Sequence, residues 1–445
     1  EHGRQTGLLA VRGFEIRQHG QLRSAADFRE AAAAALDVPQ VELPAVGVAD
    51  LDLSTSPPKA TQARNAVQSA DPLETWSRPV NQFEDFTQLN GDFKPDIYYI
   101  ILDGYARADV LQEVYAYDNT GFLDALSSRG FFVAELSHSN YTQTQLSLAS
   151  SLNFEYLDYL SFASGISSNH EPLGEMILDS RVRSLLEEAG YHFYLSGEYL
   201  FAEVSDPALV FYEHNRYKLT TFESLLLEST MFEILVDIGQ VDISNYTYQT
   251  HREKILNGFA MAERLASSTS PKFVFVHIIA PHPPFVFDQN GDPIQPDWEY
   301  TIFDDNIVTR GIDNYIDGYR NQLAYINTLT IEAIDNILDQ SPSPPIIILQ
   351  ADHGPGSLYS ATVDTSCLKE RLSILNAYYL PNGGNKDLYP SITPVNTFRV
   401  IFDTYLGTSL GLLPDSIYFS PIADRYGFVN VTNQVNLPCQ LPVQP

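Results

Sequence analysis

Aspartate and histidine residues follow three of the most hydrophobic segments of the sequence. Asp103 follows the run IIL, His282 follows VHIIAP, and the pair Asp352-His353 follows IIILQA. If these segments are parallel strands of one sheet, their carboxyl ends bring together residues that are far apart in the sequence. Carboxylates and imidazoles in one place are ligands for a divalent cation such as zinc or manganese. The three segment ends therefore predict a metal site.

Each of these residues also has a structural explanation. An aspartate just after a strand is most often a turn or helix N-cap residue, and for Asp103 alone that explanation is favoured. The Asp352-His353 pair is the sharper signal, because adjacent residues can reach one ion and the glycines that follow allow a close backbone approach. His282 lies in a proline-flanked loop that could position a functional side chain or serve the structure alone.

A second chemical signal is the segment SNYTQTQLSLASSLN at residues 139–153, in which a polar loop runs into a helix rich in small residues. Thr144 lies near the start of this helix, where the helix dipole and exposed N–H groups stabilise an alkoxide or an incoming phosphate. A bound cation would lower the pKa of the hydroxyl and make Thr144 a nucleophile for covalent phosphoryl transfer. The alternative is that Thr142, Thr144 and Ser147 only cap the helix.

The elements that must position these residues begin near Lys94. From there, short β-branched and aromatic runs alternate with helical stretches, which is typical of an α/β fold with a mostly parallel central sheet and helices on both faces. We expect strands at residues 96–102, 131–136, 191–195, 272–279, 345–349 and 373–379. Apolar residues at helical spacing predict helices at residues 173–189, 251–266 and 314–338.

The first 90 or so residues differ in character from the rest. They contain a short Ala-rich segment that favours a helix at residues 25–36 and a Pro/Ser breaker cluster at residues 54–59. We therefore expect residues 1–92 to be an N-terminal extension or linker and residues 93–445 to be one catalytic domain. The sequence starts at Glu1 without a signal segment, which suggests that an upstream segment was removed and could supply a membrane contact.

Composition limits the partners of the 445-residue chain. It has 26 Lys and Arg against 56 Asp and Glu, a net charge of −30, and 44% apolar residues. The apolar content predicts a large core, whereas the acidity argues against nucleic-acid binding, because the surface repels polyanions. No apolar run approaches the roughly 18 residues that span a bilayer. Cys367 and Cys439 lack the spacing of a zinc site and are either one disulfide or two separate thiols.

Together, these residues resemble the sulfatase-like branch of the alkaline phosphatase superfamily over roughly residues 94–425. In that family an acidic metal ligand ends the first strand, a nucleophile begins a helix, a histidine lies in a mid-chain loop, and an Asp-His-Gly turn ends a later strand. Asp103, Thr144, His282 and Asp352-His353 match this order. The resemblance implies the family's α/β fold and one divalent metal ion, Mn or Zn with Mg or Ca as alternatives, held by Asp103, Thr144, Asp352 and His353.

Within this branch, Thr144 with Ser147 is similar to the nucleophile segment of lipoteichoic acid synthases and lipid A phosphoethanolamine transferases. That resemblance implies transfer of a phosphoglycerol- or phosphoethanolamine-type group from a phospholipid or phosphate-ester donor to a cell-envelope glycan or lipid. It also implies an extracytoplasmic domain, at the cell surface or in the periplasm, of a membrane-associated protein. True sulfatases need Cys or Ser in a C/S-x-P-x-R sequence, which is missing near Thr144, so sulfate-ester hydrolysis is not expected.

Several alternatives stay open. Those transferases usually have Glu in place of Asp103, and Asp is more usual in hydrolytic relatives, so a phosphodiesterase or phosphatase is the nearest alternative, and a non-catalytic cell-surface binding or structural protein is another. A second metal ion would need further ligands, for which Asp364 and His138 are only nearby candidates. His282 could protonate the leaving group or hold the second substrate. Arg320 could pair with a substrate phosphate, although a solvated surface position is commoner for arginine.

Overall fold

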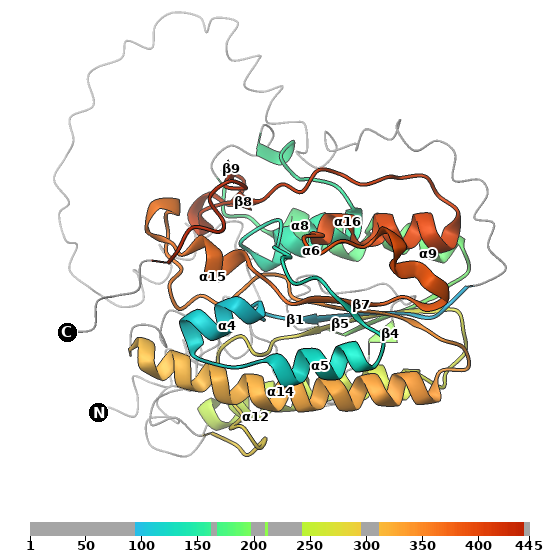
Figure 1. Ribbon diagram of the computed structural model, residues 1–445, viewed down its shortest axis with the longest axis horizontal. Helices are drawn as coiled ribbons and strands as arrows, with labels where there is room; N and C mark the ends of the chain where they lie inside the picture. Colours follow the sequence, from blue (N-terminus) through green and yellow to red (C-terminus); the bar gives the residue numbers. More distant parts are fainter. Residues whose placement is uncertain (1–93, 162–166, 197–209, 212–242, 295–310, 440–445) are drawn as a thin grey trace, which may run out of the picture. The chain divides into compact units, whose positions relative to one another are not determined.

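The computed structural model describes residues 94–161, 167–196, 210–211, 243–294 and 311–439, and Figure 1 shows their arrangement. The helix expected at residues 25–36 and the boundary expected at residue 92 lie outside the described residues. The division into an N-terminal extension and a catalytic domain therefore stays a prediction.

A seven-stranded sheet in the order β2-β7-β6-β1-β5-β3-β4 forms the centre of the described domain. Its strands are β1 (Ile97–Leu102), β2 (Phe132–Val133), β3 (His192–Ser196), β4 (Val210–Phe211), β5 (Lys272–Ile278), β6 (Ile346–Gln350) and β7 (Asn376–Tyr379). Strand β1 pairs in parallel with β5 and β6, and β3 pairs in parallel with β5 and β4. Among the described strands of this sheet, the antiparallel pairs are those that β7 makes with β6 and β2. The mostly parallel α/β sheet expected from the sequence is confirmed, and each of the six expected strands is present.

The central strands are buried on both faces, which explains their sequences. Every residue of β1, β5 and β6 is buried. Strands that are covered by helices on both sides read as continuous hydrophobic runs rather than as alternating ones. The runs IYYIIL and IIILQ therefore mark the centre of the sheet.

Helices cover both faces of the sheet (Figure 1). On one face Tyr98, Ile100 and Leu102 share a core with α4 (Ala108–Tyr115), α5 (Thr120–Ser128), α12 (Ile243–Leu265) and α14 (Ile312–Gln340). The other face packs on α6 (Thr144–Asn153), α8 (Glu171–Leu178), α9 (Arg181–Glu188) and α16 (Pro394–Ile401). There the Tyr99 hydroxyl lies 2.9 Å from Ser151 of α6, and its ring meets Phe398 of α16 edge-on at 5.1 Å.

The single helix expected at residues 173–189 is wrong, because this segment forms the two helices α8 and α9. The chain leaves the helical conformation at Asp179, and Ser180 caps the next helix by accepting a hydrogen bond from the Arg183 N–H group. The hydrophobic spacing continues across this break, so periodicity alone did not reveal it. Helix α12 begins before the expected residue 251, and α14 extends past both ends of the expected 314–338.

Short elements complete the C-terminal part of the domain. They are α15 (Leu368–Leu372), β8 (Tyr418–Phe419) and β9 (Val429–Asn430), with 3-10 helices at Val363–Thr365, Pro381–Asp387 and Ile422–Asp424 and a π-helix at Phe402–Leu406. Cys367 and Cys439 form a disulfide across 72 residues of sequence, with their Cα atoms 5.0 Å apart. This decides the alternative that the sequence left open. Among the described helices, none combines the length and the apolar character needed to cross a membrane.

Candidate active site

The parallel register brings the ends of three strands together. Ile101 of β1 pairs with Gln350 of β6, so Asp103 and Asp352 leave the sheet at the same edge. The Asp103 N–H group donates to the Ile278 carbonyl of β5 at 2.9 Å, and the His282 N–H group donates to the Asp103 carbonyl at 2.9 Å. The structure therefore places the three predicted segment ends side by side.

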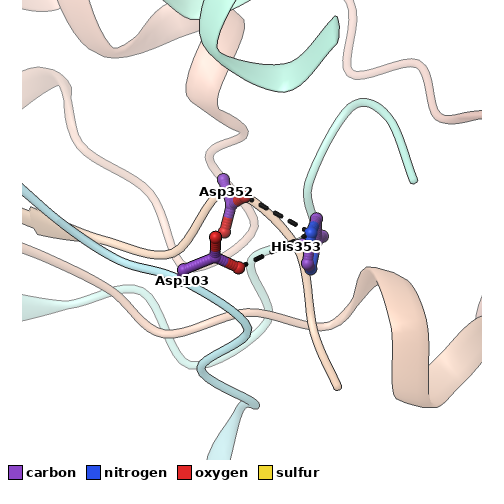
Figure 2. Close-up of side chains that lie close together, drawn as sticks. All are labelled: Asp103, Asp352 and His353. Atoms are coloured by element: carbon purple, nitrogen blue, oxygen red, sulfur yellow. Dashed lines mark ion pairs between the residues drawn. The ribbon is translucent and has the colours of Figure 1, made fainter. Parts of the chain in front are cut away.

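Asp103, Asp352 and His353 form a buried group in which one ligand atom from each residue lies within 4.8 Å of the others (Figure 2). His353 Nε2 is 3.3 Å from Asp352 Oδ2 and 3.7 Å from Asp103 Oδ1. Both of these carboxylate oxygens are buried and have no hydrogen-bond partner among the described residues. Burying two such oxygens beside an imidazole nitrogen is costly unless a cation joins them. This donor set fits a divalent cation.

The opposite side of each of these side chains is held in place. Asp103 Oδ2 accepts a hydrogen bond from His277 Nε2 at 3.1 Å, and Asp352 Oδ1 accepts one from the Gly104 N–H group at 3.2 Å. His353 Nδ1 donates to the Gly354 carbonyl at 2.9 Å. With the proton on Nδ1, the lone pair of His353 Nε2 faces the two aspartates, as metal ligation requires.

The environment also sets the protonation states of these residues. Burial raises the pKa of the Asp103 carboxyl, but the charge of His282, the hydrogen bond from His277 and the charge of His353 together bring it well below its usual range. Burial and the charge of Arg371 lower the pKa of the His353 imidazole. A carboxylate and a neutral imidazole are the forms that bind a metal, so these residues are prepared for ligation at neutral pH.

Thr144 is the first residue of α6, and its hydroxyl donates to His353 Nε2 at a distance of 3.1 Å. The helix is not capped by a side chain: the N-cap residue is Gln143, and its side chain forms no cap hydrogen bond. Thr142 bonds to the Ser420 carbonyl and Ser147 to the Tyr141 carbonyl. The capping alternative from the sequence is therefore wrong. Within the described residues, the N–H groups of Thr144, Gln145 and Leu146 at the start of α6 have no acceptor.

His282 lies beside the cluster rather than in it. Its Nδ1 atom bonds to the Pro283 carbonyl, and its ring centroid is 6.0 Å from that of His353. Gly104 has φ +72° and packs against it, since a Cβ atom at Gly104 would lie 3.4 Å from the Cβ atom of His282. The cis-proline loop thus presents the imidazole next to the ligand group.

Two residues of the site were missed by sequence reasoning. His277 lies within the apolar strand β5, and the only signal was a histidine in the run KFVFVHI. Its Nδ1 atom is buried without a hydrogen-bond partner among the described residues. Arg371 donates from Nε to the Thr142 carbonyl at 2.8 Å and from Nη1 to the Gly354 carbonyl at 3.1 Å. It therefore joins the segment that precedes Thr144 to the turn that carries His353.

Three weaker candidates lie away from the ligand group. Asp364 is in a 3-10 helix, and His138 Nε2 lies 3.2 Å from Arg107 Nη1 and 3.0 Å from Asn436 Oδ1. Arg320 is 41% exposed and lies 3.6 Å from Asp317. In the part of the chain that the structure describes, Asp103, Asp352 and His353 are the only group with the spacing of a metal site.

Comparison with known families agrees with this geometry. The family model for sulfatases matches residues 95–400. The chain therefore belongs to the sulfatase family and is an enzyme of that superfamily. A search of curated proteins found no match.

Solved structures with a similar fold include transferases and sulfatases. The C-terminal periplasmic domain of EptC from Escherichia coli is 13% identical with a TM-score of 0.46, and the match covers 77% of this chain and 95% of that one. The lipooligosaccharide phosphoethanolamine transferase EptA from Neisseria meningitidis is 11% identical with a TM-score of 0.45, covering 78% and 60%. A 2-O GAG sulfatase is 14% identical with a TM-score of 0.46, covering 74% and 77%.

Proposed function

We propose that this enzyme is a metal-dependent phosphotransferase with Thr144 as its nucleophile. It moves a phosphoglycerol- or phosphoethanolamine-type group from a phospholipid or phosphate-ester donor to a cell-envelope glycan or lipid. One observation carries the proposal: the Thr144 hydroxyl at the start of α6 contacts His353 Nε2. It lies next to two buried carboxylate oxygens that have no hydrogen-bond partner among the described residues. The C/S-x-P-x-R sequence that sulfate-ester hydrolysis would need is missing at this helix start.

Asp103, Asp352, His353 and Thr144 would hold one divalent cation, zinc or manganese. The two carboxylates balance a charge of +2, and the oxygen and imidazole donors suit both ions. When bound, such a cation lowers the pKa of a neighbouring hydroxyl and offsets negative charge on phosphoryl oxygens. The Thr144 hydroxyl, which contacts His353, would gain from both effects.

The reaction would proceed in two displacements. Thr144 Oγ1 attacks phosphorus and loses its proton to solvent, while the bond from phosphorus to the donor alcohol breaks and His282 protonates the departing oxygen. The acceptor hydroxyl then gives its proton to His282 and attacks the phosphothreonine. The bond from phosphorus to Thr144 Oγ1 breaks, and Oγ1 takes a proton from solvent, which restores the Thr144 hydroxyl. The unbonded N–H groups at the start of α6 stabilise the phosphoryl oxygens, where negative charge collects.

The disulfide supports an extracytoplasmic location. Disulfides persist in the periplasm and at cell surfaces and are rare in the cytosol. The Cys367–Cys439 bond therefore fits an enzyme that meets its acceptor in the cell envelope. Association with the membrane is part of the same proposal.

Hydrolysis is the second candidate, because the acidic ligand after β1 is Asp103 rather than glutamate. The same covalent step would then end with water as the acceptor. Product analysis separates the two functions: a transferase gives phosphodiester products whose yield rises with added alcohol, whereas a hydrolase gives the free phosphate ester at every alcohol concentration.

The decisive experiment is to trap the covalent enzyme. Zinc- or manganese-loaded protein is mixed with bis(p-nitrophenyl) phosphate, quenched in acid, and mapped by peptide mass spectrometry. We expect a phosphoryl adduct on Thr144, none in Thr144→Ala, and unchanged metal content in that variant. Thr144→Ser keeps the hydroxyl and should keep the adduct. Turnover of Thr144→Ala equal to that of the wild type would remove Thr144 from the mechanism.

A further inference from the structure

Arg425 is a buried arginine without an acidic partner. It is 8% exposed and follows the 3-10 helix Ile422–Asp424. Its Nη1 atom donates to Gln145 Oε1 at 3.0 Å, and its Nε atom donates to the Ser168 carbonyl at 3.4 Å. Across the described residues, no aspartate or glutamate forms an ion pair with it or opposes its charge.

The other buried arginines differ in this respect. Each lies beside a carboxylate: Arg107 by Asp109 at 2.7 Å, Arg183 by Glu187 at 2.8 Å, Arg371 by Glu370, and Arg399 by Asp403. Burial lowers the pKa of the Arg425 guanidinium, and only the phenols of Tyr426 and Tyr359 oppose this. Burying a charge is costly when no opposite charge accompanies it. Because the chain carries a net charge of −30, acidic residues are plentiful, and a missing partner at this position points to an anion from outside.

The position of Arg425 links this anion to the candidate active site. Gln145, which accepts its hydrogen bond, directly follows Thr144 in the first turn of α6. The N–H groups of Thr144, Gln145 and Leu146 in this turn have no acceptor among the described residues, and the start of a helix carries a partial positive charge. Gln145 is partly exposed, so a ligand can reach this place from solvent.

We propose that Arg425 and the Gln145 side chain, beside the first turn of α6, form a second anion-binding subsite next to Thr144. Its occupant is an anionic group, such as a phosphate, on the acceptor substrate. This assignment rests on the proposed function: a phospholipid donor has one phosphate, which must reach Thr144, so a second anion belongs to the other substrate. The subsite would orient an acceptor hydroxyl that lies next to its own negative group.

Phosphate binding tests the subsite without any reaction. Zinc-loaded full chain is titrated with inorganic phosphate in a calorimeter, and the wild type should bind a second phosphate in addition to the one at the metal. Arg425→Gln should lose the second phosphate or weaken its Kd by about tenfold or more, because a charge-assisted hydrogen bond is removed. Arg320→Gln, at an exposed arginine paired with Asp317, is the matched control and should bind like the wild type. Equal stoichiometry and Kd in Arg425→Gln would overturn the proposal.

A second variant and a transfer assay complete this test of the subsite. If Arg425→Gln unfolds at a lower temperature than the wild type, Arg425→Lys replaces it as the test variant. Because lysine keeps a positive charge, Arg425→Lys should retain the second phosphate with a weaker Kd. A folded wild type that binds no second phosphate overturns the subsite. In a transfer assay with bis(p-nitrophenyl) phosphate, Arg425→Gln should lower the preference for β-glycerophosphate over glycerol by about tenfold, while the first release of nitrophenol stays constant. A loss of that first release instead would assign Arg425 to the donor. If no transfer occurs, the proposed function fails, and the phosphate titration still decides the subsite.

Discussion

At the scale of single residues, the site depends on which atoms of each ligand are already occupied. His277 holds one oxygen of Asp103, the Gly104 N–H group holds one oxygen of Asp352, and the Gly354 carbonyl holds Nδ1 of His353. The second oxygen of each carboxylate and His353 Nε2, which accepts from the Thr144 hydroxyl, face one another. These hydrogen bonds on the outer side of the three residues thus fix which of their atoms point toward the centre of the site.

Removing the charge of Asp352 should remove the metal. Asp352→Asn keeps an oxygen that can accept from the Gly104 N–H group but leaves a single carboxylate to balance a divalent ion. We expect the metal content per chain, measured by elemental mass spectrometry after dialysis, to fall to a small fraction of the wild-type value. Asp364→Asn, outside the ligand group, should keep its metal. Equal metal content in Asp352→Asn and wild type would contradict the ligand assignment.

His277 should act on the metal through Asp103. His277→Phe removes the hydrogen bond to Asp103 Oδ2 and should weaken metal affinity about 10- to 100-fold, the usual effect of losing an outer-shell partner. His277→Gln keeps an N–H donor and should recover part of the affinity. Competition with a chelator measures both values, and a His277→Phe affinity equal to that of the wild type would show that the bond is incidental.

His138 should make the fold sensitive to acid. Burial and the charge of Arg107 lower the pKa of this imidazole from 6.5 to about 4. As the pH falls, this imidazole takes up its proton in the unfolded chain before it does so in the folded protein. The contribution of His138 to the free energy of unfolding is therefore complete above pH 6.5 and is lost as the pH falls to 4. The loss is about 3 kcal/mol. Urea unfolding between pH 7 and 4 should show a smaller loss in His138→Gln, and parallel curves for the two proteins would exclude this residue as the cause.

Much of this site could be predicted from the sequence because its ligands follow hydrophobic strands. Asp103 and Asp352-His353 stand where the polarity of the chain changes abruptly, and Thr144 stands where a polar loop becomes a helix. His277 could not be predicted in this way, since a histidine inside a strand gives no indication of what it faces. The role proposed for Arg425 could not be predicted from the sequence either. It depends on the lack of a neighbouring carboxylate among the described residues, which only the folded structure reveals.

At the scale of elements, the two ends of the central strands have different tasks. The carboxyl ends of β1 and β6 carry the ligands, whereas the amino end of β1 is fixed by a buried ion pair. Lys272 Nζ lies 2.5 Å from Asp96 Oδ2, and both side chains are fully buried. Asp96 also accepts hydrogen bonds from Ser270 and from the Lys272 N–H group.

Breaking this pair should destabilise the fold while the site keeps its metal. Asp96→Ala leaves the Lys272 ammonium buried without its partner and should lower the free energy of unfolding by about 3–5 kcal/mol. The double variant Asp96→Ala/Lys272→Met removes both charges and should recover part of that loss. Urea unfolding measures the stability and elemental mass spectrometry the metal; a single variant as stable as the wild type would contradict this account.

The elements themselves were predicted unevenly, for a physical reason. The central strands β1, β5 and β6 were recognisable because burial on both faces demands uninterrupted hydrophobic runs. The break between α8 and α9 was not recognised because apolar spacing continues through Asp179 and Ser180, although a serine followed by a helical segment is a typical N-cap. Strand β4 has two residues, too few for any period to appear.

At the scale of the whole molecule, the disulfide joins the C-terminal segment to the part of the chain that follows Asp352 and His353. Cys367 caps α15, where its sulfur accepts from the Glu370 N–H group. The Glu370 carboxylate in turn binds Ser357, the Leu358 N–H group and Tyr115. A change at Cys439 can therefore reach the segment that follows His353.

Removing the disulfide should weaken the fold. Cys367→Ser/Cys439→Ser frees a loop that spans 72 residues, and loop-closure entropy gives a loss of about 4 kcal/mol. Thermal unfolding of this variant, compared with wild type before and after dithiothreitol, checks the value. Dithiothreitol should lower the Tm of the wild type and leave that of the variant unchanged. An unchanged wild-type Tm after verified reduction would show that the bond adds no stability.

The pairing of β1 has a consequence for the synthesis of the chain. Its two neighbours, β5 and β6, are both far along the sequence, and 248 residues separate Gly104 from the Asp352 carboxylate that binds it. A ribosome that has released β1 must add the chain as far as β5 before one edge of that strand can be covered, and as far as β6 before the other can. Uncovered strand edges invite association between chains. The active site is consequently one of the last parts of the domain that can form, and an incomplete chain has no metal site to load.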